Sequence, residues 1–181
     1  MNGKRDALKP QDVVVLFALL LVRKSDWVVA EIASAACLSS SETHAAIKRL
    51  SLSGLFSSAT RRPVLPAVQE FLIHALKYVF PAEIGGRRGR GMPTAHSAPP
   101  LAAKIASEEE DVAVWPCPYG NARGVWVSPL YKSVPDAAQR DPDMYELLAL
   151  ADAVCIGRAR ERKLAGELLC EKIKELAREA A

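Results

Sequence analysis

The sequence contains few residues that could hold a metal ion or form a disulfide framework. It has three histidines and four cysteines, at positions 37, 117, 155 and 170, and no two cysteines form a C-x-x-C pair. A structural zinc site therefore has little support, and we expect neither a metal nor a cofactor. Because the cysteine spacing gives no argument for disulfides, we expect a reducing, cytoplasmic compartment.

Long apolar runs are also lacking. The most apolar stretch, residues 13–22, is too short to span a bilayer. Asp6 and Asp12 interrupt the basic residues before this run and charged residues follow it at once, so it departs from the pattern of a signal peptide. We expect a buried first helix and no membrane partner.

The overall composition is that of an ordinary folded protein, with 50% hydrophobic and 25% charged residues among 181. This excludes a mostly disordered chain and a collagen-like repeat. The net charge is +3, but residues 1–96 contain 13 basic and 7 acidic residues, whereas residues 97–181 contain 11 and 14. A basic first half of this kind is typical of a surface that meets a polyanion.

Hydrophobic spacing predicts helices over residues 10–23, 28–36 and 40–53. Ser39 and Glu42 have the spacing of a capping box, in which each side chain accepts a hydrogen bond from the other residue's backbone amide. Two short apolar runs then flank a basic tip at residues 57–62, which predicts a hairpin. Residues 66–80 return to helical spacing.

This order of segments resembles a winged helix-turn-helix. Over residues 10–80 the chain resembles bacterial winged-helix transcription regulators of the broad MarR-like kind. The resemblance rests on E-I-A at 31–33, L-S at 38–39, A-I-K-R-L at 46–50 and G-L-F at 54–56. It implies a DNA-binding domain over residues 1–80, with the third helix as its recognition helix.

A recognition helix approaches base edges in the major groove through short side chains near its N-terminus, while basic residues contact phosphates. Such regulators often carry a larger polar residue where this chain has Ala45, so direct base contacts should be few. The alternative is that the basic hairpin and His44 are simply solvated. The predicted DNA contacts of this domain are Ser39, Ser40, Ser41, His44, Ala45, Lys48, Arg49, Arg61 and Arg62.

Residues 81–111 are predicted to form a flexible linker, basic and then acidic. Residues 81–100 contain four prolines, four glycines and three arginines, a composition that argues against a regular element. An Arg-Gly-Arg core in a flexible arm can enter a narrow minor groove, so Arg87, Arg88 and Arg90 are candidate DNA contacts. A soluble linker is the equal alternative, and the acidic run at 108–111 is expected to be solvated.

Residues 112–181 are predicted to form a C-terminal dimerisation or effector region. Two extended pieces at 112–115 and 125–128 predict a short hairpin. The aromatic residues between 115 and 131 either build a minor core, which we favour, or line the pocket of a small-molecule effector. A long helical tail at about 142–180 carries an apolar stripe, which packs on a second subunit or within the chain. The stripe consists of Leu164, Leu168, Leu169, Ile173 and Leu176.

The predicted fold is thus mainly α with a small β wing: an N-terminal winged helix-turn-helix, an Arg/Gly/Pro-rich linker, and a C-terminal region with a short hairpin and a long helical tail. We expect a transcriptional regulator that binds double-stranded DNA in a sequence-specific manner. It should be a repressor that acts as a homodimer. The alternative is a winged-helix interaction module, such as an antitoxin or adaptor, that binds an acidic protein. We expect no enzyme, because the sequence has no recognisable phosphate loop, nucleophile–base pair or metal set.

Overall fold

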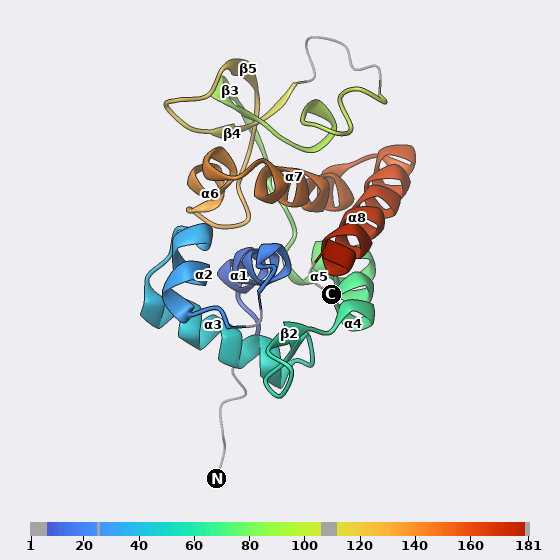
Figure 1. Ribbon diagram of the computed structural model, residues 1–181. Helices are drawn as coiled ribbons and strands as arrows, with labels where there is room; N and C mark the ends of the chain where they lie inside the picture. Colours follow the sequence, from blue (N-terminus) through green and yellow to red (C-terminus); the bar gives the residue numbers. More distant parts are fainter. Residues whose placement is uncertain (1–6, 25, 106–111, 180–181) are drawn as a thin grey trace.

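The computed structural model describes residues 7–24, 26–105 and 112–179 (Figure 1). These residues form a mainly helical protein with two small sheets. The helices are α1 (Pro10–Leu21), α2 (Val29–Ala36), α3 (Ser40–Leu52), α4 (Leu65–Glu70), η1 (Phe71–Ala75), α5 (Leu76–Val79), η2 (Ala95–Ser97), α6 (Val134–Arg140), α7 (Pro142–Ile156) and α8 (Ala159–Glu179). The strands are β1 (Phe56–Ser57), β2 (Arg62–Pro63), β3 (Ile84–Pro93), β4 (Ala113–Pro116) and β5 (Ala122–Val127).

Helix α1 lies at the centre of the molecule. Residues 12–20 are all buried, as an apolar helix without a polar face should be. It packs against α2 and α3 on one side and against α7 and α8 on the other, and one hydrophobic core includes residues from both halves of the chain. The prediction of a buried first helix is therefore confirmed.

Helices α2 and α3 and the following hairpin lie together at one end of the molecule (Figure 1). Strands β1 and β2 pair antiparallel, with Phe56 opposite Pro63. The predicted hairpin is confirmed, although each of its strands has only two residues. Leu55 and Phe56 are buried and anchor the hairpin to the helical core.

The predicted helix at 66–80 is present, with one irregular turn. Its middle part, η1, is a π-helix flanked by α4 and α5. A π-helical turn inserts an extra residue between hydrogen-bonded partners, so it shifts the faces of the helix that follows. Val68, Leu72 and Leu76 still point into the core.

The prediction of an irregular linker is wrong for residues 84–93, which form β3. Strands β3, β4 and β5 make a small closed barrel. Strand β3 is antiparallel to both partners, whereas β4 and β5 are parallel to each other. The predicted hairpin between the last two extended pieces is therefore also wrong, because their connection winds around β3 instead of folding back.

Glycine residues in β3 allow this winding because, without a Cβ, the strand can approach its neighbouring strands closely. A Cβ at Gly91 would lie 2.2 Å from the carbonyl oxygen of Trp115, and one at Gly89 would lie 2.6 Å from Nε1 of Trp126. The glycines that predict a linker by composition thus let a central strand lie against two tryptophans.

The C-terminal region begins with a capped helix, as predicted at Asp141-Pro142. The Asp141 carboxylate accepts hydrogen bonds from the amides of Asp143 and Met144, at 2.8 and 3.2 Å. The sequence predicts a long helical tail over 142–180 that Gly157 can bend, and the chain does break there: α7 ends at Ile156, and α8 folds back against α7. Leu169, Ile173 and Leu176 are buried and Leu164 and Leu168 are half-buried, so the apolar stripe packs within this chain.

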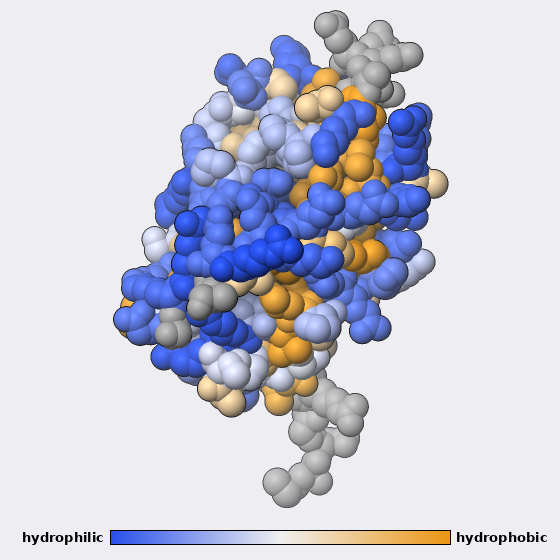
Figure 2. All heavy atoms as spheres, turned by 45° about the vertical axis from the view of Figure 1, so that its right-hand side comes forward, coloured by the Kyte–Doolittle hydropathy of each residue, from blue (hydrophilic) through white to orange (hydrophobic). Residues whose placement is uncertain are grey.

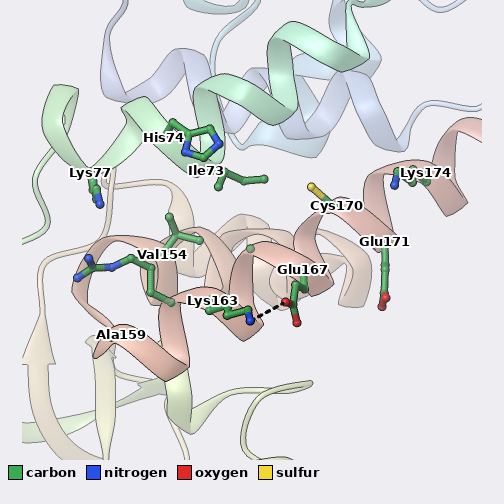
Figure 3. A pocket seen from close by; sticks show the side chains of 12 residues that line it. Ile73, His74, Lys77, Val154, Ala159, Lys163, Glu167, Cys170, Glu171 and Lys174 are labelled. Carbon is green, nitrogen blue, oxygen red and sulfur yellow. Dashed lines mark ion pairs between the residues drawn. The ribbon is translucent and has the colours of Figure 1, made fainter.

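Helix α8 also faces η1, and the two border a groove at the surface (Figure 3). With this side of the molecule brought forward, Figure 2 shows a band of apolar atoms between hydrophilic side chains.

Within the described ranges, none of the helices is long and apolar enough to cross a membrane. The acidic run at 108–111 and the residues Asp6 and Ser25 lie outside the described residues.

Candidate nucleic-acid interface

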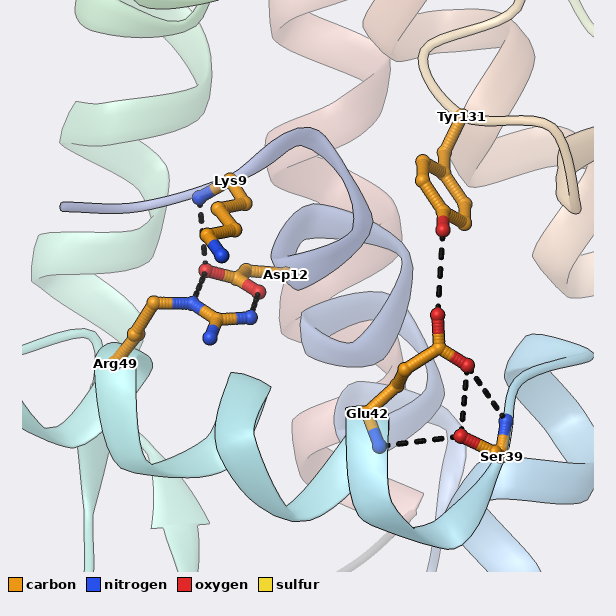
Figure 4. A network of polar contacts seen from close by, with 6 residues as sticks. All are labelled: Lys9, Asp12, Ser39, Glu42, Arg49 and Tyr131. Carbon is orange, nitrogen blue, oxygen red and sulfur yellow. Dashed lines mark hydrogen bonds and ion pairs between the residues drawn. The ribbon is translucent and has the colours of Figure 1, made fainter. Parts of the chain in front are cut away.

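The N-terminus of α3 is fixed by the predicted capping box (Figure 4). The Glu42 amide donates to Ser39 Oγ at 3.2 Å, and the Ser39 amide and hydroxyl donate to Glu42 Oε2 at 3.2 and 2.7 Å. These hydrogen bonds from Ser39 lower the pKa of Glu42. Tyr131 donates its hydroxyl to Glu42 Oε1 at 3.3 Å, so the C-terminal region braces the same cap.

The other end of α3 is fixed on its core-facing side by a buried ion pair (Figure 4). Arg49 donates from Nε to Asp12 Oδ2 at 2.7 Å and from Nη2 to Asp12 Oδ1 at 2.6 Å. The backbone amide of Lys9 donates to the same carboxylate at 2.8 Å. Only 7% of Arg49 is exposed, so the prediction that it contacts phosphates is wrong: its guanidinium faces the core and pairs with α1.

Between these two anchors, α3 presents one polar face to solvent. Ser40, Ser41, His44 and Lys48 are exposed, and Ala45 is half-buried. Thr43, Ala46 and Leu50 are buried on the opposite face. The structure therefore brings together the predicted base-reading residues and Lys48 on one exposed stripe, because spacings of three and four residues share a helix face.

The two arginine side chains of the hairpin are less free to contact DNA than the sequence predicts. Arg61 stacks on the Trp27 ring at 4.3 Å and donates to the Trp27 carbonyl oxygen, while Trp27 Nε1 donates to the Arg61 carbonyl oxygen at 3.3 Å. Arg61 also has a positive φ of 55°. This residue holds the hairpin tip against the segment before α2, and Arg62 on β2 is half-buried.

The three arginines of the predicted arm lie elsewhere. Arg87, Arg88 and Arg90 are exposed on β3, and Arg90 Nε donates to the Gly120 carbonyl oxygen at 2.8 Å. The barrel that carries them lies at the end of the molecule opposite α3, with α6 and α7 between (Figure 1). The prediction of a flexible arm is wrong here, since these residues belong to a paired strand.

One buried polar cluster was missed by the sequence interpretation. The Asp152 carboxylate accepts hydrogen bonds from Thr94 Oγ1 at 2.8 Å and from Trp115 Nε1 at 2.6 Å. Burial raises the pKa of Asp152 to about 7, although both hydrogen bonds act in the opposite direction. The available signal was an aspartate in the middle of the apolar run 147–154.

Among the described residues, no three histidine, cysteine, aspartate or glutamate side chains gather into a group that could hold a metal ion. Comparison with protein-family models, with curated proteins and with solved structures gave no match.

Proposed function

We propose that the chain binds double-stranded DNA through α3 and regulates transcription, as a repressor. The observation that carries this proposal is the exposed stripe of Ser40, Ser41, His44 and Lys48, on a helix held rigidly at both ends. Short polar side chains near a helix N-terminus can approach base edges in the major groove. Within α3 the one acidic residue, Glu42, is engaged by Ser39 and Tyr131, so the stripe carries no free carboxylate.

The position of the hairpin supports the same mode of binding. It follows α3 directly and lies at the same end of the molecule (Figure 1). We infer that the two form a winged helix-turn-helix, with α3 in the major groove and β1–β2 over the adjacent backbone. Lys48 and Arg62 would then supply phosphate contacts, which raise affinity without reading sequence.

The β3 arginines do not belong to this proposed interface. They lie on β3, at the end of the molecule opposite α3 (Figure 1), so they cannot contact the DNA segment that α3 would occupy. Similarly, the α8 stripe does not support a dimer, because it is covered by this chain. A homodimer remains part of the proposal only as two chains assembled on a two-fold operator.

The test is fluorescence-anisotropy binding to duplex DNA from upstream of the gene, with a scrambled duplex as control, over a salt series. We expect discrimination of about a hundredfold or more between the two duplexes. Lys48→Gln should weaken both and reduce the salt slope by about one unit, because one phosphate contact is lost. His44→Ala should act mainly on the specific duplex.

The matched control is Lys104→Gln, which removes an exposed positive charge from the segment between η2 and β4, outside α3 and the hairpin. It should leave both affinities unchanged. Absence of binding to either duplex would contradict the proposal and favour the alternative, an acidic protein partner for the same basic face. Light scattering of the free chain and of the complex gives the number of chains per operator.

A further inference from the structure

The groove between η1 and α8 has the size and lining of a ligand site. Its volume is about 670 Å³, within the range of about 300–1,000 Å³ common for small-molecule sites. Ile73, Val154 and Cys170 give it an apolar floor (Figure 3). Gly166 on α8 lines the groove opposite Ile73, and a Cβ there would still fit, since its nearest neighbour would be Ile73 at 3.7 Å.

The rim of the groove is positively charged. Lys77, Arg162, Lys163 and Lys174 line it, against the carboxylates of Glu167 and Glu171. The pair Lys163–Glu167 is exposed and spans 4.0 Å, so it neutralises little. Counting the lysine, arginine and glutamate side chains, the lining carries four positive and two negative charges.

Arg162 is the residue most in need of a partner. Its Nη2 donates to the Gly157 carbonyl oxygen at 3.0 Å, but its Nε is shielded from solvent and has no hydrogen-bond partner among the described residues. Buried donors without a partner are rare, because they lose water and gain nothing in return. The guanidinium that lines the groove carries a full positive charge, which a carboxylate would complement.

A second cation, Lys77 on α5, lines the same groove as Arg162. In Figure 3, Lys77 and His74 enter from the η1 side at one end of the groove. Lys163 and Lys174 lie further along the groove, so positive charge is distributed along its rim.

The backbone of this wall is itself irregular. Ile73 and His74 belong to the π-helix η1, and such turns occur frequently at functional sites because they displace side chains from the regular helix faces. This irregularity is independent of the charge and of the cavity.

We propose that the groove binds an amphipathic organic anion. Its carboxylate would pair with Arg162 and Lys77, and its apolar body would lie along Ile73, Val154 and Cys170 and past Gly166. This inference goes beyond DNA binding and does not depend on it.

The experiment is an NMR titration of the full-length chain with sodium octanoate, followed through backbone amide shifts. We expect saturable shifts at Ile73, Gly166 and Cys170, with a dissociation constant of about 1 mM or tighter. 1-Octanol, which has the same chain without the charge, should bind about tenfold or more weakly, because it cannot form the charge-assisted hydrogen bonds. Shifts that do not saturate, or equal binding of octanol, would overturn the proposal.

Two variants locate the site. Arg162→Gln should weaken octanoate about tenfold, whereas Arg160→Gln, which removes an exposed charge on the same helix outside the groove, should not. Gly166→Leu should block the groove, and Gly166→Ala should leave it open. If Gly166→Leu does not fold, the comparison of Arg162→Gln with Arg160→Gln still tests the proposal. Equal octanoate affinities in these two variants would contradict it. No DNA is present, so failure here is distinct from failure of the proposed function.

Discussion

Arg49 donates two hydrogen bonds to the Asp12 carboxylate in the core, and this contact joins the last turns of α3 to the first turn of α1. The pair lies beneath the exposed stripe of α3. It fixes the rotation of α3 about its own axis, because a bidentate arginine–carboxylate contact is planar and directional. The orientation of Ser41, His44 and Lys48 toward solvent therefore depends on this buried contact.

Removing one partner of this pair should be strongly destabilising. Arg49→Ala leaves the Asp12 carboxylate buried without its cation, which typically costs about 3–5 kcal/mol of unfolding free energy. The double variant Asp12→Leu/Arg49→Met should recover much of that loss, since no charge remains buried. Urea unfolding of the two variants checks this, and a double variant less stable than Arg49→Ala would contradict it.

The backbone at Arg61 predicts an unusual order of substitutions. Its φ of 55° favours glycine, while its side chain stacks on Trp27. Arg61→Ala loses the stacking and keeps the strained backbone, so it should be less stable than Arg61→Gly by about 1 kcal/mol. At the neighbouring Arg62, whose φ is not positive, alanine should be the better replacement. Thermal unfolding of the four variants measures both differences; the same order at the two positions would be inconsistent with the left-handed conformation.

Asp152 should make stability depend on pH. Its pKa rises from 3.8 to about 7 on folding, so the folded state holds a proton that the unfolded state releases. Its contribution is fully present below pH 3.8 and is lost as the pH rises through about 7, by at most about 1.4 kcal/mol per pH unit.

The matched variant is Asp152→Asn, whose neutral amide oxygen can still accept from Thr94 and Trp115. Its stability relative to the wild type should increase from pH 4 to pH 7 and then level off. Urea unfolding across this pH range isolates the contribution of Asp152 to the unfolding free energy, because the wild type and the variant share all other carboxylates. A stability difference that stays constant with pH would show that Asp152 does not hold this proton.

Local signals explain which parts of the fold could be predicted. The capping box and the helices depend on spacings of three or four residues, and α3 and its hairpin form where the sequence predicts them. The role of Arg49 could not be predicted in this way, since its partner lies 37 residues away in sequence. Periodicity shows that a residue is on a helix, but not what faces it.

The same limit applies to β3 and α8. By composition, residues 84–93 indicate a loop, and only the later tryptophans on β4 and β5 make glycine suitable for a strand there. The stripe on α8 was correctly identified as apolar, but α7 covers part of it rather than a second subunit. The break after Ile156, next to Gly157, lets α8 fold back on α7 and so decides between these outcomes.

Gly91 on β3 should not tolerate a side chain. It pairs with Pro116 on β4 and with Ala122 on β5, and an added Cβ would lie 2.2 Å from the Trp115 carbonyl oxygen, which is backbone and cannot turn aside. Gly91→Ala should therefore open the barrel and expose Trp115, which circular dichroism and tryptophan fluorescence would detect. Gly166→Ala is the control, because a Cβ there meets Ile73 at an ordinary 3.7 Å and alanine favours a helix by about 1 kcal/mol. Opposite signs for the two substitutions are expected; a Gly91→Ala chain with unchanged fluorescence and stability would mean that β3 is not packed this closely against β4.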